Sequence, residues 1–233
     1  MEAMLLAAGR GQRLRPLTDE TPKPLIQVGK YALVEHHLLE LAKSGVDHVV
    51  INVSYLSESI VKYIGNGSRF GIDVSYSKEP DGPIGTAAGI HKALNVFNTD
   101  QDIRVINGDI YTDFNFEKFS KPESSSIHLV LVPNPEHNLK GDFRLLSGVA
   151  HPVKGELGER YTYSGIGIFE KKLFEKLPDR CIELGDLIRY YIPTGKVTAE
   201  LHTSTWIDVG TIDRLEQARR LESCKAEQSF VST

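Results

Sequence analysis

Short apolar runs alternate with amphipathic segments along the first half of the chain. Four runs have the length and composition of buried parallel strands, at residues 4–8, 48–53, 72–77 and 103–107. Between them, apolar residues recur every three or four positions, which predicts helices over 32–44, over 56–64 and around Ile90, Leu94 and Phe97. This alternation predicts an α/β fold in three layers with right-handed crossovers, and ligands outside the carboxyl ends of the strands.

The regular alternation fades after Asp113. Further strands are expected at 127–132, 161–169 and 197–201, with helices over 184–192 and from Thr211 onward. The glycines inside the strand at 161–169, Gly165 and Gly167, predict a bulge or a close backbone approach. Pro, Gly, His and charged residues crowd positions 133–160, which predicts a hairpin and long loops. We expect one domain over 1–222, with halves at 1–113 and 114–222, and a disordered tail over 223–233.

The composition of the chain argues against several classes of protein. The 233 residues are 40 % apolar and 25 % charged, which is ordinary for a globular domain, and the net charge of −4 argues against nucleic-acid binding. No cleavable leader and no run of membrane-spanning length is visible, so no membrane partner is expected. Isolated Cys181 and Cys224 favour a reducing cytoplasm. None of the eight histidines has metal-ligand spacing, and His36 and His37 are expected on a helix surface.

The stretch after the first strand carries the strongest chemical signal. Gly9 and Gly11 interrupt the apolar run just beyond Ala8, and three arginines follow between positions 10 and 15. Glycines let a ligand approach the main chain, and a glycine turn with fixed cations is suited to hold a polyphosphate. Lys23 stands between two prolines, which predicts a stiffened, extended backbone. The alternative is a strand, a turn and a solvated basic loop.

This stretch resembles the signature of the sugar-1-phosphate nucleotidyltransferase family, G-x-G-x-R-x-x-P followed by P-K-P. The resemblance implies a Rossmann-like three-layer nucleotidyltransferase fold with a mixed, mostly parallel central sheet. It implies transfer of a nucleotidyl group from a nucleoside triphosphate to a sugar 1-phosphate, with the nucleotide in the first half and the sugar in the second. In that family pattern Ala8, Gly9 and Gly11 bind the nucleotide, Arg13 contacts the β,γ-phosphates, and Lys23 contacts the α-phosphate or the sugar phosphate.

Two aspartates are the candidate metal ligands. Asn107-Gly108-Asp109 ends the fourth predicted strand, where the alternative is an ordinary turn, and Asp208 lies on a short apolar strand before Gly210. A carboxylate at this sheet edge would suit a hard cation bound to phosphates. The resemblance implies that Asp109 and Asp208 together hold Mg²⁺, and that Asn107 and Gly108 contact the nucleotide.

A loop rich in proline and glycine follows the third strand. It resembles the base-recognition loop of the family, and it places Glu79, Gly85 and Thr86 in the nucleotide site. A carboxylate at Glu79 can accept from a ring N–H, which suits uracil, thymine or guanine. The alternative is a loop in which Thr86 caps the following helix.

The second half lacks the E-K-P element that binds the sugar phosphate in many family members. Its G-D-F-R-L and T-Y-S-G-I elements resemble the branch that makes UDP-N-acetylmuramic acid from UTP and the 1-phosphate in cell-wall recycling. Asn134, Asp142 and Ser164 are then the candidate sugar contacts, or else turn and bulge residues. A mannose-1-phosphate guanylyltransferase, a glucose-1-phosphate thymidylyltransferase and a non-catalytic nucleotide-binding regulatory subunit stay open. So does the oligomeric state.

Overall fold

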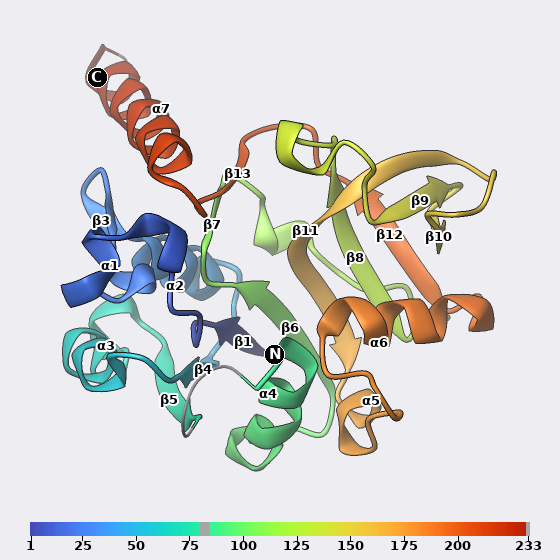
Figure 1. Ribbon diagram of the computed structural model, residues 1–233. Helices are drawn as coiled ribbons and strands as arrows, with labels where there is room; N and C mark the ends of the chain where they lie inside the picture. Colours follow the sequence, from blue (N-terminus) through green and yellow to red (C-terminus); the bar gives the residue numbers. More distant parts are fainter. Residues whose placement is uncertain (80–83, 232–233) are drawn as a thin grey trace.

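A central sheet of nine strands organises the protein (Figure 1). The computed structural model describes residues 1–79 and 84–231, with side chains to residue 225. The first half of the chain contributes four parallel neighbours, in the order β5 (Asp73–Lys78), β4 (His48–Val53), β1 (Glu2–Leu6) and β6 (Asp102–Asn107). Strand order therefore reverses between β1 and β6, because the chain leaves β1 toward β4 and returns on its other side.

The second half extends the same sheet. Its strands follow β6 in the order β11 (Glu159–Glu170), β8 (Ile127–Val132), β12 (Val197–Leu201), β10 (Val149–Pro152) and β9 (Phe143–Leu146). β11 runs antiparallel to β6 and β8, whereas β12 runs parallel to β8, so the predicted mixed sheet is confirmed. A bulge interrupts β11 at Gly165, where φ is +84° and an added Cβ would lie 2.6 Å from the Asn107 amide nitrogen. The bulge therefore makes room for the side chain of Asn107, one of the predicted nucleotide-binding residues.

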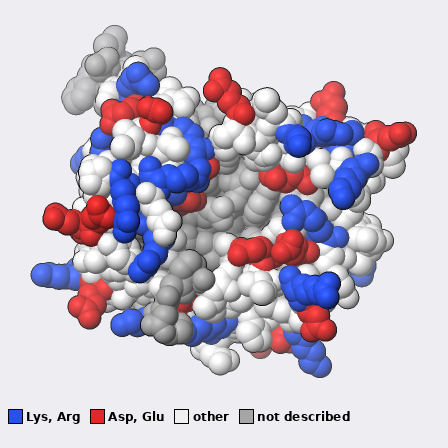
Figure 2. Space-filling model, viewed as in Figure 1, with Lys and Arg blue, Asp and Glu red and all other residues white. Residues whose placement is uncertain are grey.

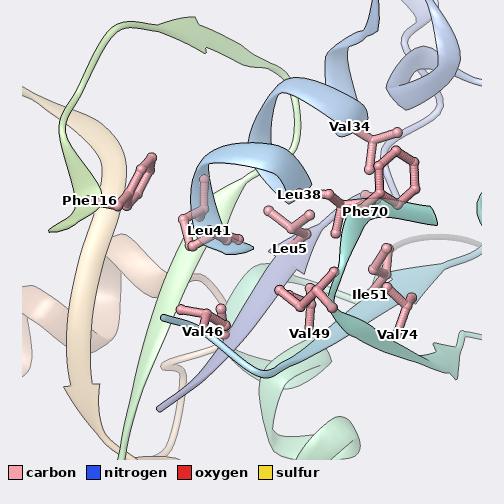
Figure 3. Packing of buried hydrophobic residues seen from close by; sticks show 14 of the residues in the cluster. Leu5, Val34, Leu38, Leu41, Val46, Val49, Ile51, Phe70, Val74 and Phe116 are labelled. Carbon is pink, nitrogen blue, oxygen red and sulfur yellow. The ribbon is translucent and has the colours of Figure 1, made fainter. Parts of the chain in front are cut away.

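Helices cover both faces, because sheet side chains alternate between them. One face packs on α2 (Leu33–Lys43) and α3 (Ser57–Ile64), and Figure 3 shows Leu5 of β1 among Leu38, Leu41 and Val49. The opposite face, which includes Met4, packs on α4 (Thr86–Ala93), α5 (Lys172–Glu175) and α6 (Leu184–Tyr191). The predicted three layers are confirmed. No helix within the described ranges is long and apolar enough to cross a membrane.

A helical turn, two small two-stranded units and a C-terminal helix add to this core. They are α1 (Leu17–Glu20), the hairpin of β2 (Gln27–Val28) and β3 (Tyr31–Ala32), the ribbon of β7 (Ile110–Thr112) and β13 (Trp206–Asp208), and α7 (Ile212–Val231). α7 continues to Val231, although the sequence suggested disorder from residue 223. Contacts of the Tyr111 hydroxyl with Glu222 and Lys225 hold this extension against β7.

Leu5 gives a direct test of the core. It is fully buried in the central strand. Replacing it with alanine should lower the free energy of unfolding by about 3 kcal/mol, because the lost burial and the cavity both cost stability. Urea denaturation measures this loss. Leu139→Ala is the matched control, since that leucine is 74 % exposed and should change stability by less than about 0.5 kcal/mol. Equal losses in the two variants would contradict this packing.

His37 is buried, which corrects the expectation that it lies on the helix surface. Its side chain is only 3 % exposed, and its Nε2 donates to the carbonyl oxygen of Ile110 at 2.9 Å, beside the candidate metal ligand Asp109. Burial is the main cause that lowers the pKa of His37 from 6.5 to about 4. Between these two pH values the unfolded chain binds a proton that the folded chain does not, so stability falls as pH falls.

Acidification should therefore lower the free energy of unfolding through His37 by about 3 kcal/mol; the loss begins below about pH 6.5 and is complete below about pH 4. Urea midpoints of the wild-type protein and of His37→Gln, measured from pH 7.5 to 4, test it. Glutamine can donate to the same carbonyl but does not titrate, so the variant should lose less stability across this window. Parallel pH profiles for the two proteins would contradict the assignment.

Candidate active site

A cavity lies at the reversal of strand order between β1 and β6, where ligands of such sheets bind. Its volume is about 600 Å³, and Figure 2 shows a hollow between the two halves, with Lys and Arg gathered on the rim of the N-terminal half. All the residues predicted to bind nucleotide line it, as do both predicted catalytic cations; they are Ala8, Gly9, Gly11, Arg13, Lys23, Glu79, Gly85, Thr86, Asn107 and Gly108.

The turn after β1 has a defined shape. Gly11 takes a φ of +64°, and an added Cβ would lie 2.9 Å from Thr18 and 3.2 Å from Lys23, so a side chain does not fit. The Thr18 hydroxyl donates to the Gly11 carbonyl at 2.8 Å and holds the turn. Gly9 has no positive φ, and an added Cβ there would meet nothing within 4 Å. The cavity beside Gly9 is therefore open to a ligand.

Glu79 belongs to a buried chain of hydrogen bonds under the cavity. Its Oε1 accepts from the Asn52 amide at 2.7 Å, and Asn52 Oδ1 accepts from the backbone N–H of Ala7 at 2.7 Å. Its Oε2 accepts from the N–H of Ile84 at 3.1 Å, and the side chain is 1 % exposed. Glu79 thus shapes the cavity floor instead of presenting a free carboxylate. Residues 80–83 of the base-recognition loop lie outside the described residues.

A second carboxylate reaches the cavity from the other half of the chain. Glu183 Oε2 accepts from the N–H and the hydroxyl of Thr86, at 3.1 and 2.8 Å, and so caps α4. The Thr86 hydroxyl in turn accepts from the N–H of Leu184 at 2.6 Å and caps α6. This reciprocal capping joins the two halves. Glu183 and Asn52 line the cavity, and no local pattern in the sequence points to either.

Lys23 and Asp109 form an ion pair at the cavity wall. The Lys23 Nζ lies 2.6 Å from Asp109 Oδ2, and the lysine is 8 % exposed. Pro22 is extended, but Lys23 itself opens a 3₁₀ turn over Lys23–Leu25, which differs from the extended backbone expected. Because lysine is rarely buried without a partner, the pair fixes its ammonium at one place.

β7 and β13 bring the second aspartate to the first. Their antiparallel pairing sets Asp208 opposite Ile110, and the N–H of Val209 donates to the carbonyl of Asp109 at 2.9 Å. Arg214 NH1 lies 2.9 Å from Asp208 Oδ2. No group of three or more His, Cys, Asp or Glu side chains among the described residues is arranged to hold a metal. Asp109 pairs with Lys23 and Asp208 pairs with Arg214, each through Oδ2, so Oδ1 of each aspartate lies outside these ion pairs. Two such carboxylate oxygens suit a hard cation that takes its other ligands from phosphates and water.

A second cavity of about 410 Å³ opens on the side of β11 and β13. Asp142 and Ser164, two of the three predicted sugar contacts, line it together with Thr162, Trp206 and both candidate metal ligands. Asn134 does not line it; its Oδ1 accepts from the Thr162 hydroxyl at 3.0 Å behind the wall. Ser164 is 1 % exposed, and its hydroxyl accepts from the N–H of Ile166 at 3.1 Å.

The two cavities share Arg13, Asn107 and Asp109 in their walls. A ligand in the first cavity therefore meets a ligand in the second beside a guanidinium, an amide and a carboxylate. Such a junction can align two phosphorylated molecules for group transfer.

The fold and this junction define a nucleotidyltransferase, and sequence comparison agrees. Residues 2–141 match the model of the Nucleotidyl transferase family, which is more than half of the chain, so the chain belongs to that family. The family resemblance seen in the sequence is confirmed. Enzymes of this family generally use a divalent metal.

Two relatives match this chain over almost the whole length of both sequences. The chain is 42 % identical over 229 residues to the N-acetylmuramate alpha-1-phosphate uridylyltransferase of Neisseria meningitidis serogroup B, covering 95 % of this chain and 98 % of that one. It is 29 % identical over 230 residues to the D-glycero-alpha-D-manno-heptose 1-phosphate guanylyltransferase of Aneurinibacillus thermoaerophilus, covering 94 % and 97 %. A crystal structure of a Bacillus anthracis protein assigned as a glucose-1-phosphate thymidylyltransferase shares the fold, with a TM-score of 0.80, 21 % identity and 95 % of both chains covered.

Proposed function

We propose that this enzyme transfers a uridylyl group from UTP to N-acetylmuramate 1-phosphate and forms UDP-N-acetylmuramate and pyrophosphate. The observation that carries the reaction class is the junction of two cavities at Arg13, Asn107 and Asp109. The 42 % identity to the Neisseria uridylyltransferase, over nearly the full length of both chains, supports the choice of base and sugar. UTP is an intracellular nucleotide, so a cytoplasmic location fits this reaction.

The chemistry needs no nucleophile from the protein. A phosphate oxygen of the sugar 1-phosphate is already ionised near pH 7 and attacks the α-phosphorus of UTP in line. The bond from that phosphorus to the bridging oxygen breaks, and its electron pair leaves with pyrophosphate. Catalysis then consists of positioning the two phosphates and neutralising their charge.

The residues at the junction divide this work. Arg13 contacts the departing β,γ-phosphates, and Lys23 contacts the α-phosphate or the sugar phosphate. Asp109 and Asp208 would hold Mg²⁺, which when bound neutralises charge on the reacting phosphates. The main chain at Ala8, Gly9, Gly11 and Gly108, with the walls at Asn107, Gly85 and Thr86, encloses the nucleotide above the Glu79 floor. On the sugar side, Asp142 and Ser164 form the wall, and Asn134 supports it from behind.

The direct test mixes the purified protein with UTP, N-acetylmuramate 1-phosphate and MgCl₂, and identifies the products by mass. UDP-N-acetylmuramate and pyrophosphate should appear in equal amounts, and EDTA should stop their formation. Pyrophosphate released without a sugar phosphate, or a nucleotide sugar formed at the same rate in EDTA, would contradict the proposal.

A further inference from the structure

A side-chain amide with a fixed orientation lies in the floor of the first cavity. Asn52 of β4 lines this cavity, although the residue is only 4 % exposed. Its Oδ1 accepts from the backbone N–H of Ala7 at 2.7 Å, and its Nδ2 donates to Glu79 Oε1 at 2.7 Å. Because a backbone N–H only donates, the amide oxygen must face Ala7, and the amide nitrogen must then face Glu79.

The amide nitrogen of Asn52 carries a second hydrogen that these bonds do not use. A primary amide has two N–H donors, and Glu79 is the single acceptor of Nδ2 within residues 1–79 and 84–225. Gly89 of α4 packs against this pair, since an added Cβ there would lie 3.2 Å from Nδ2 and 2.7 Å from Glu79 Oε1. The open space beside the amide is the cavity. Because buried donors are nearly always paired, a ligand acceptor is expected there.

Negative charge beside the amide restricts what this acceptor can be. Glu79 is 1 % exposed and accepts at both oxygens, from Asn52 and from the N–H of Ile84. Its carboxylate is one hydrogen bond away from the amide nitrogen, so a phosphate placed there would be repelled. Arg13 and Lys23, which attract phosphates, lie instead at the junction with the second cavity. The uncharged carbonyl oxygens of a nucleobase are the acceptors that suit the floor.

We propose that the second N–H of Asn52 donates to a ring carbonyl oxygen of the nucleobase, and that Ala7 and Glu79 hold the amide in place for this contact. The inference rests on the proposed function, in which the base is uracil and carries carbonyl groups at C2 and C4. The buried bonds of Asn52 orient the donor before the nucleotide arrives, so little ordering is needed on binding.

Calorimetric titration with UTP, 2-thio-UTP and 4-thio-UTP, each with MgCl₂, tests this contact. Each analogue replaces one ring carbonyl oxygen by sulfur, which is a weaker hydrogen-bond acceptor. In the wild-type protein one of the two analogues should have a Kd about tenfold higher than that of UTP. In Asn52→Ala the Kd of UTP should rise by a similar factor, and the difference between UTP and that analogue should disappear, because the donor is gone.

Asn98→Ala is the matched control. The Asn98 amide donates to Glu2 Oε1 at 3.2 Å, and Glu2 is also a buried carboxylate, but it lies at the opposite end of β1 from the cavity. This variant removes the same type of bond. It should keep the wild-type Kd values for UTP and for both analogues, even where its stability falls.

The outcomes separate the contact from a purely structural role of Asn52. A structural role would weaken all three nucleotides equally in Asn52→Ala and leave the penalty of the thio analogue in place, which overturns the inference. Should Asn52→Ala not fold, the wild-type titrations decide, since equal Kd values for the three nucleotides also overturn it. A wild-type protein that does not bind UTP, and that turns over another nucleotide, would instead overturn the proposed function and with it the uracil contact.

Discussion

Asp109→Asn should lower kcat at saturating substrates by at least about a hundredfold to a thousandfold, the usual cost of losing one charge-stabilising group. Asparagine keeps the shape of the side chain, and its oxygen can still accept from Lys23, so the fold should persist. What it loses is the negative charge that a hard cation requires. Stopped assays of pyrophosphate release measure kcat, and titration with UTP should show weakened but detectable binding.

Two further variants sharpen this test. Asp208→Asn should cost a similar factor, and the double variant should cost far less than the product of the two, because residues that act as a unit are not additive. Asp186→Asn removes an exposed carboxylate that pairs with Arg189 and should leave kcat unchanged. Substantial Mg²⁺-dependent turnover by Asp109→Asn would contradict the metal assignment.

Lys23→Met should be the other severe loss, again about a hundredfold or more in kcat. Methionine fills most of the buried volume of the lysine stem but carries no charge for the transferred phosphate. The same change also leaves Asp109 without the ion pair at 2.6 Å. Steady-state rates against UTP and sugar phosphate should show the loss mainly in kcat, since the missing interaction is strongest in the transition state.

Lys30→Met is the matched control, because that lysine is exposed and its ammonium lies over the ring of Tyr31. It should keep both kcat and KM. If Lys23→Met raised only KM and left kcat intact, Lys23 would contribute uniform binding rather than catalysis. Its placement at the reacting phosphate would then be wrong.

The layered core could be predicted because local periodicity encodes it. The strands at 48–53, 127–132 and 197–201 have the predicted bounds, and the first two are buried on both faces along their whole length. The ribbon of β7 with β13 was predicted only in part, because Ile110–Thr112 follows a turn and gains its partner from a segment almost a hundred residues away. The hydrophobic pattern within a short stretch of sequence carries no information on pairing between such distant strands.

The residues that line the first cavity could be predicted for a similar reason. Most of them follow the parallel strands β1, β5 and β6, and the parallel strands of one sheet end at one edge. Asn52 and Glu183 could not be predicted, because each acts through a distant partner, Glu79 and Thr86 respectively. Asn134 was placed in the sugar site by its motif, yet its side chain supports the wall of the cavity from outside.

His37 shows the limit of reading a helix face from composition. Polar residues on an amphipathic helix are expected outside, but this histidine faces inward and satisfies one nitrogen at the Ile110 carbonyl. The contact with Ile110, which is distant in the sequence, therefore decides that this side chain is buried.

The most direct test of the proposed function is pyrophosphate release over a grid of UTP, dTTP, GTP and CTP against N-acetylmuramate, mannose, glucose and N-acetylglucosamine 1-phosphates. One strong rate is predicted, for UTP with N-acetylmuramate 1-phosphate. A dominant rate for GTP with mannose 1-phosphate, or for dTTP with glucose 1-phosphate, would contradict the assigned substrates while keeping the reaction. No rate with any pair would contradict the assignment of the cleft as a catalytic site.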